Sequence, residues 1–122
     1  MENDVKIWHN PRCGTSRNVL NTLKENGIEP EVFLYLQTPP SKKELKRIIK
    51  LLKIPAEALV RKKEAIYLES FADSVKSEEE WIDILHENPQ LIERPIVIKG
   101  RKAVLARPPE EVWKWLKIKP GA

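Results

Sequence analysis

Residues 5–36 read VKIWHNPRCGTSRNVLNTLKENGIEPEVFLYL, and the residue pattern changes twice along this segment. Apolar and polar side chains alternate over residues 5–7, as a short strand requires, and a His-Asn-Pro loop ends the run. Apolar residues recur at helical spacing over residues 15–26, and Gly27 stands where a helix commonly ends. Residues 31–36 are rich in β-formers and follow a proline. The segment therefore predicts a strand, a helix and a second strand parallel to the first.

A mostly helical segment is predicted between about residues 41 and 88. Ser41 and Ser77 each stand three residues before a glutamate, which is the pattern of a capping box at a helix N-terminus. Apolar residues follow both serines at helical spacing, and Pro89 closes the segment. We interpret this segment as a helical insertion after the second strand.

The C-terminal part predicts a β-hairpin and one more helix. Two short β-rich runs, residues 96–98 and 103–106, flank a turn that contains Gly100. A pair of prolines followed by a pair of glutamates then suits a helix N-terminus. The predicted fold is α/β: a thioredoxin-like mixed four-stranded sheet in which the helical insertion separates the βαβ unit from a C-terminal ββα unit. We expect residues 1–122 to form a single domain of this kind.

Composition and charge limit the classes of partner. The 122 residues include 22 Lys and Arg against 18 Asp and Glu, a net charge of +4, and they contain one cysteine. This balance favours a small oxyanion over a cationic ligand, and it is modest for a nucleic-acid-binding protein. One cysteine cannot form an internal disulfide, and the sequence has neither a long apolar leader nor an apolar run of membrane length. We therefore expect a cytoplasmic monomer that binds neither nucleic acid nor membrane.

The candidate reactive residue is Cys13, within the run His-Asn-Pro-Arg-Cys-Gly-Thr-Ser-Arg at residues 9–17. The cysteine follows a predicted strand and stands at the first turn of a predicted helix. Unpaired backbone N–H groups and the positive end of the helix dipole stabilise a thiolate there, and they also bind anions. We expect His9, Arg12 and Arg17 to add positive charge around the sulfur. A lone cysteine is often an inert core residue, but these neighbours favour a nucleophile.

Small and hydroxyl side chains complete the predicted loop. Gly14 lets the backbone approach a ligand closely, and the hydroxyls of Thr15 and Ser16 can donate to a bound oxyanion or to the sulfur. An alternative for His9 is a surface residue that merely ends its strand. His9, His86 and the one cysteine do not form a metal-ligand spacing, so we expect no metal.

The run at residues 9–17 resembles the His-Asn-Pro-x-Cys-x-x-Ser-Arg signature of the glutaredoxin-coupled arsenate reductase family, whose members have a thioredoxin fold with a helical insertion. The resemblance covers nearly the whole chain in family order, through residues 35–40, 59–62, 88–97 and 106–108. The chain departs from the family at Arg12, where a small residue is usual, and it ends at Ala122, short of the family's longer C-terminal tail. An uncharacterised branch of the family shares such features.

The resemblance implies a set of site residues. Its candidate catalytic residues are Cys13 and His9, and its candidate substrate-binding residues are Asn10, Gly14, Thr15, Ser16, Arg17, Arg61, Arg94 and Arg107. A guanidinium suits this role because it stays charged and presents a planar fork of donors to a tetrahedral oxyanion. The resemblance also implies a cis peptide bond between Arg94 and Pro95, against an ordinary trans proline at a strand start as the alternative.

These residues predict a thiol oxidoreductase, with arsenate reduction as its reaction. Cys13 would attack an oxyanion such as arsenate, glutathione would enter the adduct as co-substrate, and glutaredoxin would restore the thiol, with no bound cofactor. One alternative is a regulator or adaptor related to stress regulators that bind RNA polymerase and sense oxidation through a Cys-x-x-Cys pair. Ser16 stands in place of the second cysteine, which leaves only a redox-independent version of that role. The other alternative is a general glutathione-dependent thiol reductase.

Overall fold

The computed structural model describes residues 4–120, and the chain groups into two compact units. The sheet unit comprises the described residues up to Thr38 together with those from Arg94 onward. The helical unit comprises residues 39–93. The prediction of a single domain with an insertion at about 41–88 stays a prediction, and the boundaries of the helical unit lie close to those of that insertion. Within residues 4–120, no helix has the length and apolar character needed to cross a membrane.

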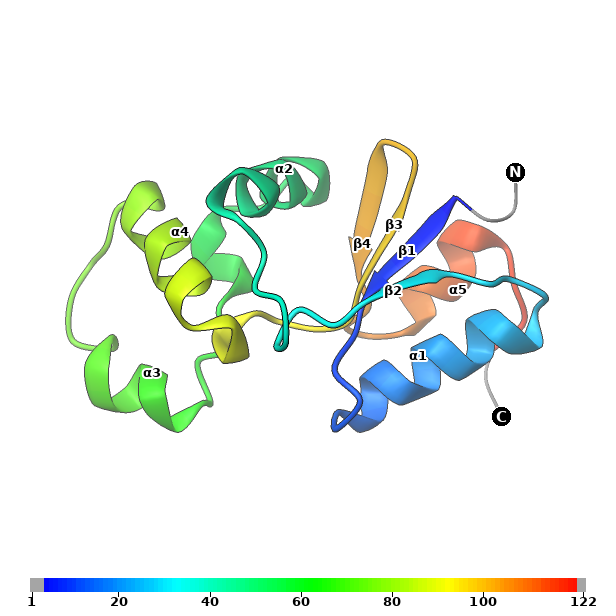
Figure 1. Ribbon diagram of the computed structural model, residues 1–122, viewed down its shortest axis with the longest axis horizontal. Helices are drawn as coiled ribbons and strands as arrows, with labels where there is room; N and C mark the ends of the chain where they lie inside the picture. Colours follow the sequence, from blue (N-terminus) through cyan, green and yellow to red (C-terminus); the bar gives the residue numbers. More distant parts are fainter. Residues whose placement is uncertain (1–3, 121–122) are drawn as a thin grey trace. The chain divides into compact units, whose positions relative to one another are not determined.

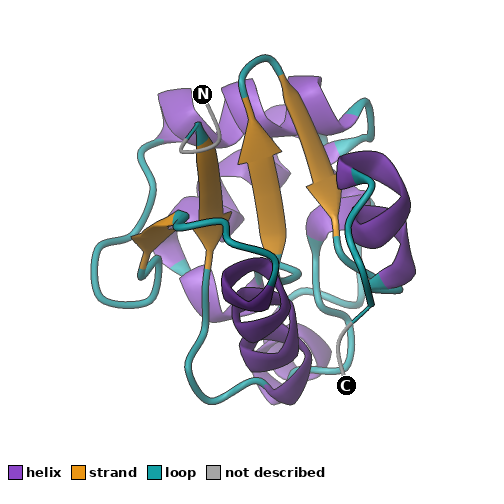
Figure 2. Ribbon diagram, turned by 90° about the vertical axis from the view of Figure 1, so that its right-hand side faces the viewer, coloured by secondary structure: helices purple, strands orange, loops and turns teal. Residues whose placement is uncertain are grey.

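The sheet unit confirms the predicted thioredoxin-like α/β fold. The strand order is β2-β1-β3-β4, with β1 and β2 parallel and the other two pairs antiparallel (Figures 1 and 2). Its elements are β1 (Val5–Trp8), α1 (Gly14–Glu25), β2 (Glu31–Phe33), β3 (Ile96–Lys99), β4 (Lys102–Leu105) and α5 (Glu110–Leu116).

The core of the sheet unit lies between one face of the sheet and the helices α1 and α5. The buried residues that form this cluster come from three strands or strand ends and both helices; they are Val5, Ile7, Val19, Leu23, Val97, Ala106, Val112 and Trp113. Burying a side chain of this size stabilises a fold by about 1.5–3 kcal/mol. The cluster therefore fixes α1 against the sheet through Val19 and Leu23 and, with it, the loop that carries the cysteine.

The second strand is shorter than predicted. The sequence interpretation extended it over residues 31–36, but β2 ends at Phe33. Among residues 4–120 it pairs with β1 alone, and the last paired residues are Trp8 and Phe33 because β1 itself ends there. The chain then turns, with the N–H groups of Gln37 and Thr38 both donating to the Leu34 carbonyl at 3.0 Å. A strand at the edge of a sheet cannot continue past its only partner, which the residue pattern alone does not reveal.

The helical unit contains α2 (Lys42–Leu52), α3 (Ala65–Ser70), α4 (Glu78–Glu87) and two 3₁₀ turns, η1 (Ala56–Leu59) and η2 (Pro89–Leu91). Ser41 caps α2 by accepting the N–H of Glu44, and Ser77 and Glu80 form a complete capping box at α4. Ion pairs join α2 to α4 through Lys42 and Asp83 at 2.8 Å and through Lys46 and Glu79 at 3.1 Å. The mostly helical segment predicted here is confirmed.

Candidate active site

Cys13 lies where the loop after β1 enters α1. It is the N-cap residue of that helix, with φ −96° and ψ 121°, and it is partly exposed. Its backbone N–H donates to the Asn10 carbonyl at 3.0 Å, and its carbonyl accepts the Arg17 N–H at 2.9 Å. The sulfur therefore lies beside the first backbone N–H groups of a helix, where a negative charge is stabilised.

Side chains of the loop hold its own backbone in place. The Asn10 carbonyl oxygen Oδ1 accepts the N–H of Arg12 at 3.0 Å, and the Asn10 N–H donates to Ser16 Oγ at 3.1 Å. The Arg17 guanidinium donates to the Pro11 carbonyl at 2.9 Å. Asn10 and Arg17 were both predicted to bind substrate, and the structure places these polar groups on the loop instead. Any additional contact with substrate stays a prediction.

His9 and Ser16 form the buried base of the loop. The ring nitrogen Nδ1 of His9 lies 2.6 Å from Ser16 Oγ, and both residues are buried. The pKa of His9 lies below its ordinary value because burial disfavours the charged ring and because the cations Lys24 and Arg17 repel it. The lowered pKa disfavours the positively charged ring that was predicted near the sulfur.

The hydroxyl of Ser16 is held inside the loop. Its oxygen accepts the Asn10 N–H at 3.1 Å and lies 2.6 Å from His9 Nδ1, and its predicted bond to the sulfur or to an oxyanion stays a prediction. The backbone N–H of Ser16 favours the Cys13 thiolate. The sequence interpretation named the hydroxyl of this residue and not its backbone N–H, because side-chain hydroxyls are visible in a sequence and backbone directions are not. The hydroxyl of Thr15 stays a predicted donor.

The pKa of Cys13 is lowered from its ordinary value. Burial acts against this and would raise the pKa, but several groups together outweigh it: the backbone N–H of Ser16, the Arg94 guanidinium through a hydrogen bond and through its charge, and the backbone N–H of Thr15. The sulfur is thus poised as a nucleophilic thiolate. The cation among these groups is Arg94, which is far from the loop in sequence.

Two arginines from the C-terminal hairpin border the sulfur. Ile96 pairs with Leu105 in the antiparallel register of β3 and β4, which brings Arg94 and Arg107 to the same end of the hairpin. The Arg107 guanidinium lies 3.8 Å from Cys13 Sγ through Nη2, and its Nε donates to the Arg94 carbonyl at 2.8 Å. The structure therefore brings these predicted residues together with Cys13.

The peptide bonds that follow these two arginines are both cis. The bond from Arg94 to Pro95 has the geometry that the family resemblance implies. The bond from Arg107 to Pro108 is also cis, and the sequence analysis did not single it out. Its only signal was another Arg-Pro pair, which base rates favour as trans.

Arg61 lies in the helical unit and has carboxylate partners there. Its Nη1 donates to Glu93 at 3.1 Å, and its Nε lies 3.6 Å from Glu64. The Arg61 side chain is only 20% exposed, so these ion pairs are partly shielded from water. Its predicted part in an anion site with Cys13 stays a prediction.

Gly14 is the first residue of α1 and is exposed. A Cβ placed on it would meet Arg17 Nη2 at 3.8 Å, which is an ordinary contact distance. The protein itself therefore does not require a glycine here. A requirement could only come from a ligand that approaches the backbone closely, as predicted.

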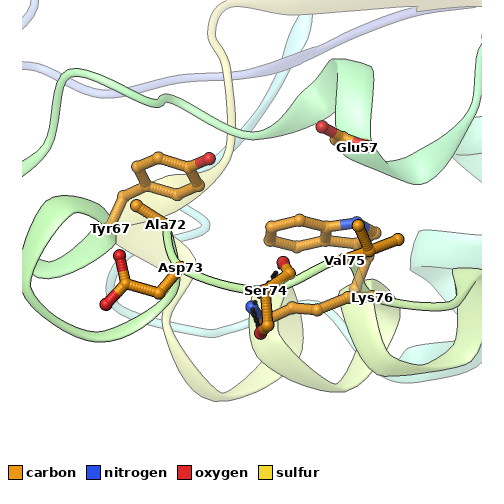
Figure 3. Close-up of a pocket in the computed structure, with 8 residues that line it drawn as sticks. Glu57, Tyr67, Ala72, Asp73, Ser74, Val75 and Lys76 are labelled. Carbon is orange, nitrogen blue, oxygen red and sulfur yellow. Dashed lines mark hydrogen bonds between the residues drawn. The ribbon is translucent and has the colours of Figure 1, made fainter.

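Two pockets differ in the chemistry of their walls. A pocket of about 330 Å³ adjoins the cysteine loop and is lined by His9, Asn10, Pro11, Arg12, Leu34, Leu36 and Gln37. A pocket of about 280 Å³ lies in the helical unit (Figure 3) and is lined by Glu57, Tyr67, Ala72, Asp73, Ser74, Val75, Lys76 and Trp81. The second pocket has neither cysteine nor histidine in its lining. In the described part of the chain, no group of three or more His, Cys, Asp or Glu side chains is arranged to hold a metal ion. The candidate active site is therefore the cysteine loop with Arg94 and Arg107.

Comparisons with known proteins agree with this site. Residues 8–115 match the ArsC family. An uncharacterised protein of Escherichia coli (strain K12), YfgD, is 52% identical over 114 residues, which cover 92% of this chain and 96% of that protein. An arsenate reductase of Escherichia coli is 44% identical over 110 residues, which cover 89% of this chain and 78% of that protein. The structure of an arsenate reductase from Vibrio cholerae superposes with a TM-score of 0.85 at 43% identity, covering 94% of this chain and 97% of that one.

Proposed function

The chain belongs to the ArsC family, and on that premise we propose that it is a thiol oxidoreductase that reduces arsenate with the Cys13 thiolate. The observation that carries the proposal is the surrounding of one sulfur: backbone N–H groups and Arg94 lower its pKa, and Arg107 lies 3.8 Å away. The same donors suit a tetrahedral oxyanion held against the nucleophile. Arsenate reductase relatives at 40–44% identity support this choice of substrate.

The chemistry follows from having a single cysteine. The Cys13 thiolate attacks the arsenic atom, an As–S bond forms and an arsenate oxygen leaves as water after protonation. A glutathione thiolate then attacks the Cys13 sulfur, so an S–S bond forms and the As–S bond breaks with its electron pair left on arsenic. As(V) gains two electrons and leaves as arsenite, while the Cys13 sulfur and the glutathione sulfur become a mixed disulfide. A second thiol, carried by glutathione or glutaredoxin, reduces this disulfide and frees Cys13. Because the chain has one cysteine, every disulfide of the cycle must involve an outside thiol.

The test measures NADPH consumption by the purified protein in the presence of arsenate, glutathione, glutaredoxin and glutathione reductase. Mass spectrometry of the protein detects adducts on Cys13 in the same reaction. We expect arsenate-dependent turnover and a glutathione adduct on Cys13 that disappears when reduced glutaredoxin is added. Glutathionylation that needs a general oxidant such as diamide and never depends on arsenate would refute the proposal.

A general thiol reductase is the second candidate, and one observation favours it. The groups that lower the pKa of Cys13 act without any oxyanion, so the thiolate is equally ready for thiol–disulfide exchange. The assay above separates the two candidates, because a thiol reductase would consume NADPH with a disulfide substrate but not with arsenate.

A further inference from the structure

The proposed function assigns no ligand to the pocket of about 330 Å³ beside the cysteine loop. Its lining includes Arg12, the chain neighbour of Cys13, but neither Arg94 nor Arg107. The pocket therefore reaches the residue next to the nucleophile and is lined by residues other than the two arginines that border the sulfur.

The walls of this pocket are held by buried contacts. One wall is the cysteine loop and the other is the turn after β2, and the His9 N–H joins them by donating to the Phe33 carbonyl at 2.9 Å. Tyr35 is fully buried and its ring stacks on Trp8 with centroids 6.4 Å apart. With Tyr35 anchored inward, the next two residues of the turn, Leu36 and Gln37, are exposed. The pocket is thus part of the folded sheet unit and needs no closing movement to form.

The lining combines one cation, an amide and apolar surface. Arg12 is exposed and offers a guanidinium fork to a carboxylate. The Gln37 amide can pair with a peptide group, and Leu34 and Leu36 supply apolar contact. His9 is only 6% exposed and uses Nδ1 on Ser16, so Nε2 is the ring nitrogen that a ligand can meet. This combination suits a small anionic peptide better than an inorganic anion, which needs no apolar wall or amide partner.

We propose that this pocket binds the thiol co-substrate, an anionic peptide thiol of the glutathione class, and that Arg12 binds one of its carboxylates. The proposal rests on the proposed function, because that function requires an outside thiol to reach Cys13. Arg12 and Cys13 are consecutive residues with Cα atoms about 3.8 Å apart, so a peptide bound at Arg12 lies next to the residue that carries the nucleophile. Arg12 is accordingly a specificity-determining residue for the thiol and not for the oxyanion.

The experiment measures thiol–disulfide exchange of the reduced protein without arsenate. The Cys13 thiolate attacks one sulfur of a disulfide, a mixed disulfide forms, and the other half leaves as a thiolate. Three disulfides are compared by mass spectrometry over time: anionic glutathione disulfide, neutral hydroxyethyl disulfide and cationic cystamine. The ratio of the rates with glutathione disulfide and hydroxyethyl disulfide cancels any change in the thiolate fraction of Cys13.

We expect this ratio to fall about fivefold in Arg12→Ala and about tenfold in Arg12→Glu, with the preference moving toward cystamine in the latter. Gln37→Ala lowers the ratio less. The matched control is Arg101→Glu, which makes the same charge change at an exposed position on the turn between β3 and β4 and leaves the ratio unchanged. Thermal unfolding of each variant verifies that it is folded.

Equal ratios in Arg12→Glu and Arg101→Glu would overturn the pocket assignment. The outcome is separable from that of the proposed function, because no arsenate is present in this assay. A protein that fails to reduce arsenate but shows the Arg12-dependent preference refutes the reductase proposal and supports the pocket. A protein that reduces arsenate without that preference supports the reductase proposal and refutes the pocket assignment.

Discussion

Arg94 and Arg61 carry the same side chain in two units of the chain, and their surroundings differ. Arg94 acts on the Cys13 sulfur and lowers its pKa. Arg61 lies between Glu93 and Glu64, at 3.1 and 3.6 Å, and its charge is already matched within the helical unit. A guanidinium beside a thiolate stabilises the reactive form of the sulfur, whereas a guanidinium paired with carboxylates contributes mainly to the stability of the fold. The two positions therefore give matched variants that separate activity from stability.

Removing the nucleophile of the sheet unit has the largest expected effect. Cys13→Ser replaces a thiolate by a neutral hydroxyl, which is a far poorer nucleophile at this position. We expect arsenate turnover to fall by a factor on the order of 10³ or more, with the thermal midpoint little changed because Cys13 is partly exposed. Coupled NADPH kinetics and a thermal melt measure both quantities. Substantial turnover in this variant would place the reaction outside the cysteine loop.

Exchanging the cation at the sulfur comes next. In Arg94→Gln we expect the pKa of Cys13 to rise, because a hydrogen bond and a positive charge that favour the thiolate are lost. Thiolate absorbance against pH therefore shifts toward higher pH, and turnover falls about 10²-fold as an oxyanion donor is removed. Arg61→Gln leaves the pKa of Cys13 where it was, because the Arg61 charge is matched by its own carboxylates. An equal shift of the Cys13 pKa in Arg94→Gln and Arg61→Gln would show that the two arginines do not differ in their effect on the sulfur.

In the helical unit, we expect removal of the arginine to lower the stability of the fold and not the reactivity of Cys13. Arg61→Met leaves the carboxylate of Glu93, whose side chain is 24% exposed, without its partner at 3.1 Å. We expect urea unfolding to lose about 1–2 kcal/mol of stability, since a partly buried charge loses a charge-assisted hydrogen bond. Lys42→Met is the control, because it breaks an ion pair whose side chains are about half exposed. The comparison fails if the control is destabilised as much as Arg61→Met.

The sequence predicted the local parts of this molecule well. The order of elements, the helix that begins at the cysteine and the capping box at Ser77 all follow from neighbouring residues. The early end of β2 and the inward hydroxyl of Ser16 depend on groups that are distant in sequence or on backbone direction, so residue patterns could not supply them. Arg94 was named by the family resemblance and not by any local pattern, because the register of the hairpin brings it to Cys13.

The residues that line the pocket beside the cysteine loop could likewise be predicted from the sequence only in part. Arg12 was visible in the sequence as a departure from the family pattern, but Leu36 was assigned to a strand and Gln37 to no element of the site. Their exposure beside the cysteine loop follows from the turn that the chain makes after Phe33 and from the burial of Tyr35. A predicted strand places successive side chains on opposite faces of a sheet. Because β2 ends at Phe33, this alternation does not apply to Leu36, and the pocket could not be predicted from it.

The smallest expected effects concern two glycines of the sheet unit. A Cβ at Gly14 meets only an ordinary contact at 3.8 Å, so Gly14→Ala keeps the stability or raises it by up to about 0.5 kcal/mol. If the oxyanion approaches the backbone there, the added methyl group raises KM for arsenate about threefold or more. Gly100→Ala is the matched control: its φ of +61° strains any larger residue and costs about 1 kcal/mol, yet the turn between β3 and β4 has no part in the proposed chemistry, so KM stays unchanged. Urea unfolding and arsenate kinetics on both variants test whether Gly14→Ala changes KM and not stability, and whether Gly100→Ala changes stability and not KM. A KM that is unaffected in Gly14→Ala would mean that the anion is held by the arginines and does not approach the backbone at Gly14.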